Sequence, residues 1–186
     1  LLPKERAEAI FRLYYVCRTL DDWADEGHGE KLREARQCWS EHRPHELLDH
    51  YRFLQARWGL DSLPLTELMD AMLREQEGVR IKSEAELLEY CHGVAGTIGL
   101  MTCPIFGVTE PDALQHADDL GIAMQLTNIC RDVREDAEND RIYLPADFFT
   151  TSPSVSDLLS KDSKWIEETV LVLSLIHISE PTRLRS

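Results

Sequence analysis

Apolar residues recur every three to four positions along most of the chain, which is the spacing of helices that bury one face. The clearest run covers residues 4–25, and Pro3 stands where such a helix would begin. Further helices are predicted over residues 31–39, 46–58 and 65–78, separated by glycine or proline. The first half of the chain is therefore expected to be helical.

The second half predicts two longer helices. Ser83 is the expected N-cap of a helix that runs through a glycine-rich stretch at residues 93–99. Another helix begins at Pro111 and continues to about Asp136, whereas serine, threonine and proline at 150–156 indicate a loop. No segment alternates in the manner of a strand, so the predicted fold class is all-α.

The two ends of the chain are treated separately from the rest. The segment after the helical pattern around Trp165 resembles a translated sequencing-adapter read-through. We therefore expect a partial domain over residues 1–170 and a non-native tail over residues 171–186, with a native strand-prone tail as the alternative. Because the chain begins with Leu1 rather than methionine, we also expect it to be cut from a longer protein.

Composition limits the kinds of partner that the chain is expected to bind and the compartment in which it is expected to lie. A chain of 186 residues suits one domain, and its formal net charge of −14 disfavours binding to nucleic acid. Its five cysteines are odd in number and form no CxxC pair, which favours reduced thiols in a cytoplasmic protein. No run approaches the roughly 18–20 apolar residues of a membrane span.

A first acidic motif lies at the end of the first predicted helix. Asp21 and Asp25 are one turn apart, and Tyr14 and Arg18 precede them on the same flank, next to Asp22. Like charges at this spacing weaken an isolated helix by roughly 0.2–0.5 kcal/mol per pair, so folding alone does not explain them. Carboxylates suit Mg²⁺ and arginine suits a diphosphate, while a solvated acidic helix end is the alternative.

A second motif of the same kind lies in the last long helix. Gln125, Asn128, Asp132 and Asp136 follow the spacing i, i+3, i+7 and i+11, which is one helical face. The rise from Asn128 to Asp136 is roughly 12 Å, enough for several metal ions along a diphosphate. Two carboxylates about 6 Å apart would repel by about 3 kcal/mol at an effective dielectric near 20. The two motifs together therefore predict a shared metal site.

These motifs carry a resemblance to a known family. Residues 14–26 resemble the first aspartate motif of the squalene/phytoene synthase family, and residues 125–136, followed by 141–145, resemble the second. Residues 93–99 are similar to the glycine-rich segment between them. The resemblance covers roughly residues 1–150. It implies an all-α isoprenoid-synthase helical bundle and the head-to-head joining of two prenyl diphosphates.

The resemblance also implies roles for single residues. The implied metal ligands are Asp21, Asp25, Asn128, Asp132 and Asp136, with Mg²⁺ as the ion and Mn²⁺ as an alternative. The implied substrate-binding residues are Arg18, Gly96, Gln125, Asn128 and Arg131. The residues implied at the reaction centre are Tyr14, Arg18, Gln125 and Tyr143.

The product is left open by the resemblance. The first expectation is two geranylgeranyl diphosphates joined to phytoene through a cyclopropyl intermediate. Squalene or dehydrosqualene from farnesyl diphosphate is the alternative, with NADPH used only if squalene forms. A lipophilic product implies peripheral contact with the inner membrane face, and the oligomeric state is not predicted.

Three other functions are alternatives to head-to-head condensation. Head-to-tail elongation normally shows an arginine pair after the first motif, whereas residues 27–30 read Gly-His-Gly-Glu. A terpene cyclase and a non-catalytic helical assembly protein that retains the fold are further alternatives. Because helices that complete the family's pocket are expected to be missing, an active and an inactive fragment both stay open.

Three further patterns have two interpretations each. The glycine run at 93–99 follows a helix rather than a strand, so it is no dinucleotide fingerprint. Its small residues admit either a neighbouring helix or a prenyl chain. His42, His45 and His50 are expected to be surface residues rather than a metal cluster, and Trp23 faces either a neighbour or the pocket.

Overall fold

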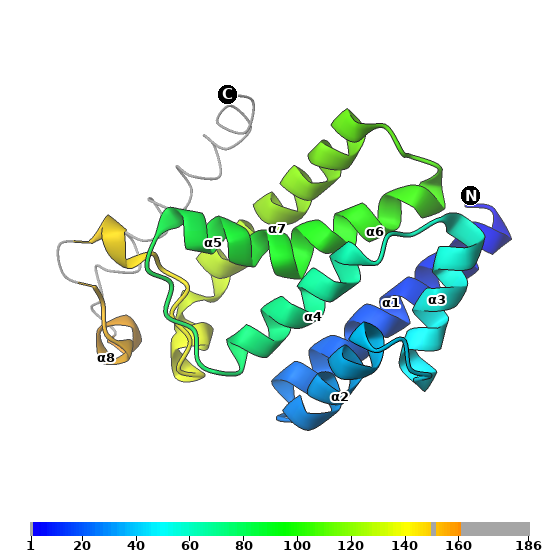
Figure 1. Cartoon of the computed structure of the whole chain (residues 1–186). Coiled ribbons are helices and arrows are strands. Elements are labelled where there is room, and N and C mark those ends of the chain that lie inside the picture. The colour runs from blue at the N-terminus through cyan, green and yellow to red at the C-terminus, as the bar shows by residue number, and fades with distance from the viewer. Residues whose placement is uncertain (1, 150–151, 161–186) are drawn as a thin grey trace.

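The computed structural model describes residues 2–149 and 152–160, and these residues are mainly helical (Figure 1). The elements are α1 (Lys4–Asp25), α2 (Gly29–Ser40), α3 (Glu46–Trp58), α4 (Leu63–Glu75), α5 (Glu84–Cys91), a π-helical segment (His92–Gly96), α6 (Thr97–Phe106), α7 (Pro111–Glu138), a 3₁₀ turn (Ala146–Phe148) and α8 (Val155–Leu159). The described residues contain no strand, only an isolated bridge between Arg80 and Ile142. The prediction of an all-α fold is confirmed.

The predicted helix ends follow from local chemistry. Gly59 ends α3 and Gly107 ends α6, each in the left-handed conformation that glycine adopts without strain. Ser83 caps α5 by accepting the N–H of Glu86 at 3.2 Å, as its sequence position predicted. α4 spans Leu63–Glu75 rather than residues 65–78, and the Asp61 carboxylate accepts the N–H of Leu63 at its start.

One predicted helix is divided, and one predicted loop contains a helix. The stretch expected to be one helix from Ser83 is α5, the π segment and α6 in succession. The loop predicted for residues 150–156 was wrong at its end, because α8 begins at Val155. Ser154 and Asp157 cap it reciprocally, a pattern present in the sequence. Trp165 and the tail at 171–186 lie outside the described residues.

The apolar side chains form two clusters. The first joins α1 to α4 with the later part of α6, and includes Leu20 and Met101. The second joins α5, α7 and α8 with the segments before α5 and after α7, and includes Leu87 and Leu126. In Figure 1 the helices α4 and α6 lie side by side between these two regions, and they are in contact. α6 contacts both α1 and α7, and it holds these two helices on different sides of the space between them.

The glycine stretch serves the packing of helices. A Cβ at Gly93 would lie 2.7 Å from the Ala71 Cβ of α4, and one at Gly99 would lie 2.4 Å from the Ala117 carbonyl oxygen of α7. Such distances leave no room for a side chain. Of the two interpretations of this stretch, the close approach of neighbouring helices describes these two glycines.

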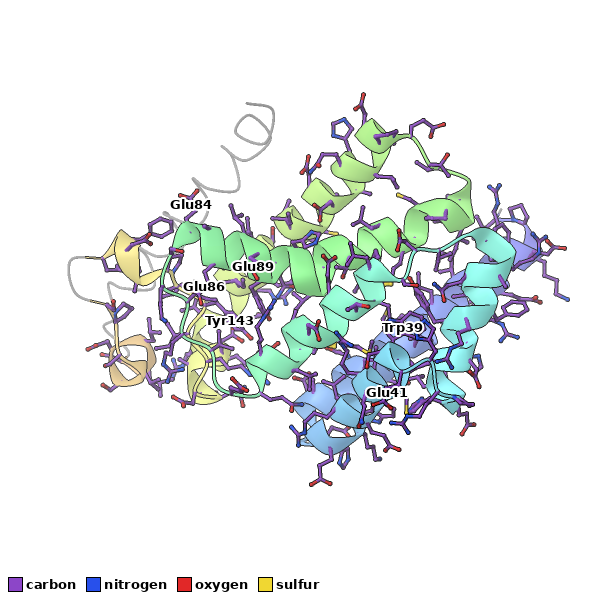
Figure 2. The ribbon with its side chains drawn as sticks, in the orientation of Figure 1. Trp39, Glu41, Glu84, Glu86, Glu89 and Tyr143 are labelled. Atoms are coloured by element: carbon purple, nitrogen blue, oxygen red, sulfur yellow. The ribbon has the colours of Figure 1, made fainter. Side chains whose placement is uncertain are left out.

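The surroundings of Trp23 and of the histidines bear on two further predictions. Trp23 packs against the first cluster and meets the His45 ring edge to face, so it faces a neighbour. Figure 2 shows Trp39 among α2 and α3, on the other side of the molecule from Tyr143. His50 contacts Arg12 and Tyr15, and the described histidines belong to no group of three potential metal ligands.

Candidate active site

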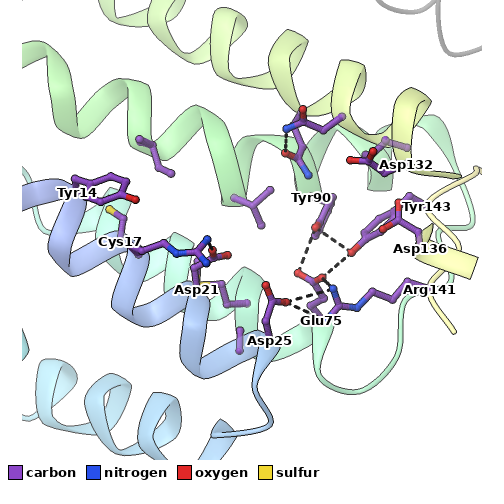
Figure 3. A pocket seen from close by; sticks show the side chains of 18 of the residues that line it. Tyr14, Cys17, Asp21, Asp25, Glu75, Tyr90, Asp132, Asp136, Arg141 and Tyr143 are labelled. Carbon is purple, nitrogen blue, oxygen red and sulfur yellow. Dashed lines mark hydrogen bonds and ion pairs between the residues drawn. The ribbon is translucent and has the colours of Figure 1, made fainter. Parts of the chain in front are cut away.

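A cavity of about 920 Å³ lies between α1, α4, α7 and the continuous stretch formed by α5, the π segment and α6. The predicted site residues that line it are Tyr14, Arg18, Asp21, Asp25, Gln125, Asn128, Arg131, Asp132, Asp136 and Tyr143. Figure 3 shows Asp21 and Asp25 on one wall, with Asp132 and Asp136 across the cavity from them. Two motifs more than a hundred residues apart in sequence therefore share one site.

The α1 wall pairs its carboxylates with arginine. Arg18 donates to Asp21 at 2.7 Å and contacts Asp22 at 2.8 Å. Burial and the neighbouring Asp25 carboxylate raise the pKa of Asp21, while Arg18 opposes the rise. Asp22 holds Arg18 without being among the residues that line the cavity.

The α7 wall contains two carboxylates with opposite pKa shifts. The Nε–H of Arg131 donates to Asp132 at 2.7 Å, and this hydrogen bond lowers the pKa of Asp132. One turn further on, burial raises the pKa of Asp136 to about 6, and the charge of Asp132 adds to the rise. Asn128 donates to the Gln125 side-chain oxygen at 3.3 Å on the same face.

The donor set fits a hard divalent cation. The four predicted aspartates and the amide of Asn128 are among the residues that line the cavity, and burial together with the charge of Asp132 raises the pKa of Asp136. Within the described residues, no three acidic, histidine or cysteine side chains already converge on one point. This arrangement suits Mg²⁺, which binds through one or two carboxylates together with substrate phosphates and water.

The glycine-rich stretch contributes to the cavity through the side chains that lie beside its glycines. Gly96 is not among the lining residues, since a Cβ there would lie 1.9 Å from the Asp118 carboxylate of α7. Val94 and Ile98 on either side of it do line the cavity. The structure thus places apolar side chains, rather than the Gly96 backbone, beside the space for substrate.

One side of the cavity is a stripe that sequence reasoning did not recognise. Tyr90, Val94, Ile98, Thr102 and Phe106 all line it, at a constant spacing of four residues. The spacing is present in the sequence, where three glycines lie between these positions. The stripe makes this wall mainly apolar, as a site for a prenyl chain requires.

A second group, of which only Tyr143 was predicted as a site residue, lies at the acidic end. Glu75, Tyr90, Arg141 and Tyr143 form a network of hydrogen bonds and ion pairs (Figure 3). Burial and the Glu75 carboxylate raise the pKa of both tyrosines above the ordinary value, so both stay protonated at neutral pH. No spacing rule connects Glu75 with residues 15 to 68 positions away, so no local pattern could have predicted it.

Cys17 also lines the cavity, but its thiol is not a reactive nucleophile. Burial, followed by the charge of Asp21, raises the pKa of this thiol to about 12. A thiol with such a pKa is protonated at neutral pH and is a poor nucleophile. We therefore assign Cys17 to packing.

Comparison with known proteins bears on the family of the chain. A family model described as squalene/phytoene synthase matches residues 1–173. The chain belongs to this family. A phytoene synthase of Thermus thermophilus is 40% identical over 153 residues, which cover 79% of this chain and 53% of that protein. A presqualene diphosphate synthase of Rhodopseudomonas palustris is 35% identical over 157 residues, covering 79% and 56%.

Solved structures of the squalene/phytoene synthase family share the fold. A dehydrosqualene synthase crystallised with a ligand matches with a TM-score of 0.81 and 27% identity, over 96% of this chain and 66% of that one. A squalene synthase from Alicyclobacillus acidocaldarius matches with a TM-score of 0.75 at 20% identity, over 98% and 74%. The predicted isoprenoid-synthase fold is confirmed, and the chain spans about half the length of the curated relatives it matches.

Proposed function

We propose that the chain carries the site for Mg²⁺-dependent head-to-head condensation of two prenyl diphosphates, with two geranylgeranyl diphosphates giving phytoene. The observation that supports this is one cavity with an acidic motif on each of two walls and an apolar stripe beside them. The phytoene synthase names of several relatives favour this product. The dehydrosqualene synthase neighbour keeps farnesyl diphosphate as the alternative substrate, with NADPH required only for squalene.

The roles of the cavity residues follow from their chemistry. Mg²⁺, held by Asp21, Asp25, Asn128, Asp132 and Asp136, would supply Lewis-acid neutralisation of the departing diphosphate. Arg18 and Arg131 offer paired N–H donors that match diphosphate oxygens. The apolar stripe excludes water from the allylic carbon after its C–O bond breaks.

The remaining polar residues orient the reaction. Tyr14, Gln125 and Tyr143 line the space where the double bond of the second substrate would attack the allylic cation. Loss of a proton then closes the cyclopropyl ring, and this intermediate keeps the diphosphate of the second substrate. That diphosphate would depart in a second ionisation at the same donors.

The proposal predicts Mg²⁺-dependent release of pyrophosphate from geranylgeranyl or farnesyl diphosphate. Changing Asp21→Asn or Asp132→Asn should lower the rate by about a hundredfold or more, since each removes a proposed ligand. The measurement is pyrophosphate release, with the product identified by mass spectrometry. Asp112→Asn, an exposed change in the first turn of α7, is the control and should leave the rate unchanged.

Two outcomes would contradict the proposal in different ways. Unchanged turnover in both the Asp21 and Asp132 variants would overturn the assigned metal ligands. A full-length version of the protein that shows neither Mg²⁺ dependence nor pyrophosphate release would favour the non-catalytic helical assembly protein.

The proposal extends to a cytoplasmic location with peripheral contact at the inner membrane face, where a lipophilic product would leave. No helix in residues 2–149 and 152–160 has the length and apolar character needed to cross a bilayer. Phe11 and Leu120 are each more than half exposed and provide apolar surface for such a contact. Co-sedimentation with lipid vesicles tests it, and a chain that stays in the supernatant would contradict it.

A further inference from the structure

Glu75 is a carboxylate enclosed by donors at the end of α4. Its side chain is 13% exposed and accepts hydrogen bonds from the Tyr143 hydroxyl at 2.6 Å and the Tyr90 hydroxyl at 3.2 Å. The Arg141 Nη1 lies 3.1 Å from the same carboxylate. A shielded carboxylate needs such partners, and here the partners come from α5 and from the segment after α7.

Arg141 is shared between Glu75 and the first acidic motif. Its Nη2 lies 3.3 Å from the Asp25 carboxylate, a longer contact than the one to Glu75. Asp25 is 54% exposed, so water screens its attraction for the guanidinium more than that of Glu75. Figure 3 shows dashed lines from the guanidinium to both of these carboxylates. Glu75 is therefore the stronger anchor of the two.

We propose that Glu75 is a positioning residue for Arg141, keeping its guanidinium at the acidic end of the cavity without letting it neutralise Asp25. The inference rests on the proposed function, in which Asp25 binds a divalent cation. When that cation binds, Arg141 loses one carboxylate and stays in place through the other. Without Glu75, Asp25 is the one ion-pair partner left to Arg141 among the described residues, and the guanidinium competes with the cation.

A double-mutant cycle on the whole chain, read by Mn²⁺ binding, tests this role. Mn²⁺ alone is the probe, followed by the electron paramagnetic resonance of the free ion and by calorimetry. Glu75→Gln, which keeps the shape of the side chain, should weaken Mn²⁺ binding about tenfold when Arg141 is present. In the Arg141→Gln background the same change should cost less than about twofold, because no guanidinium remains to compete.

The double-mutant cycle distinguishes the anchoring of Arg141 by Glu75 from the simple loss of one negative charge near the cation. Losing one negative charge near the site would weaken Mn²⁺ binding equally in both backgrounds, and that result would overturn the positioning role alone. Glu89→Gln is the matched control, because it makes the same charge change at an exposed residue of α5 that pairs with Arg74. The control should change Mn²⁺ affinity by less than about twofold.

Two further results complete the test. A wild-type chain that binds no Mn²⁺ would overturn the metal-dependent function, and the positioning role with it. Circular dichroism melting establishes that each variant is folded. If Glu75→Gln does not fold, Glu75→Asp replaces it, since a withdrawn carboxylate should also weaken binding with Arg141 present and not in its absence.

Discussion

Neighbouring carboxylates in the cavity hold their protons differently because their own neighbours differ. Asp132 has an arginine beside it and a lowered pKa, whereas Asp136 is more buried, lies next to Asp132 and has a pKa of about 6. The sequence predicted both residues from their helical spacing but not this contrast. The contrast depends on the burial of Asp136 and on the charge of Asp132, while Arg141, which approaches from outside α7, reduces it.

At the scale of single residues, the two tyrosines beside Glu75 should differ in their contribution to stability. Tyr143→Phe removes the 2.6 Å hydrogen bond and should lower the free energy of unfolding by about 1–2 kcal/mol. Tyr90→Phe removes a 3.2 Å bond and should cost about 0.5–1 kcal/mol. Urea unfolding measures both values. Equal losses, or a larger loss for Tyr90→Phe, would contradict the ranking.

At the scale of elements, glycine and proline predicted where most helices begin and end. The predicted bounds at residues 4–25 and 46–58 agree with α1 and α3, whose ends are determined by adjacent residues. The π segment was not predicted, and neither was the close approach of Gly93 to α4 and of Gly99 to α7. Local sequence therefore described the helices better than it described how they pack.

The contact between α6 and α7 makes Gly99→Ala a test of this packing. Alanine normally stabilises a helix interior relative to glycine by about 1 kcal/mol. Here its methyl group would lie 2.4 Å from a backbone oxygen of α7, so we expect a net loss of about 1–3 kcal/mol in thermal unfolding.

Gly29→Ala is the control for this prediction. Its methyl group would meet the side chain of Gln76, whose flexible end can move away. A Gly99→Ala chain as stable as the wild type would show that α6 and α7 separate more easily than the structure indicates.

At the scale of the whole molecule, a charged cluster joins three elements outside the cavity. His92 in the π segment lies 2.6 Å from Asp118 of α7 and 3.4 Å from Glu67 of α4. The hydrogen bond with Asp118, aided by Glu67, raises the pKa of His92 against the effect of burial. The sequence could not predict this cluster, because its members are about 25 residues from His92 on either side.

The cluster gives the stability of the fold a pH dependence. Because the folded state raises the pKa of His92, its contribution is complete below the ordinary pKa of about 6.5 and is lost as pH rises through the raised value. His92→Gln should therefore destabilise the chain by about 1 kcal/mol at pH 6 and by less at pH 9. Urea unfolding at the two pH values is the measurement.

His116→Gln is the matched control for the pH prediction. His116 is more exposed than His92 and lies 3.8 Å from Asp119 of its own helix. Its replacement should change stability little at either pH. A His92→Gln penalty that is equal at pH 6 and pH 9 would contradict the ionic role of the cluster.

The π segment also constrains how many residues the cavity wall contains. In a regular α-helix, positions four apart drift by about 40° per step, so five of them would spread over about 160° of the helix surface. One inserted residue turns the helix back by about 100°, which keeps Tyr90 and Phe106 within about 60° of one another. If the same residues formed a regular α-helix without this wider turn, α6 would be rotated by about 100° against α5, and the two clusters would be out of phase. The wider turn between Tyr90 and Phe106 is thus as much a requirement of the site as the side chains themselves.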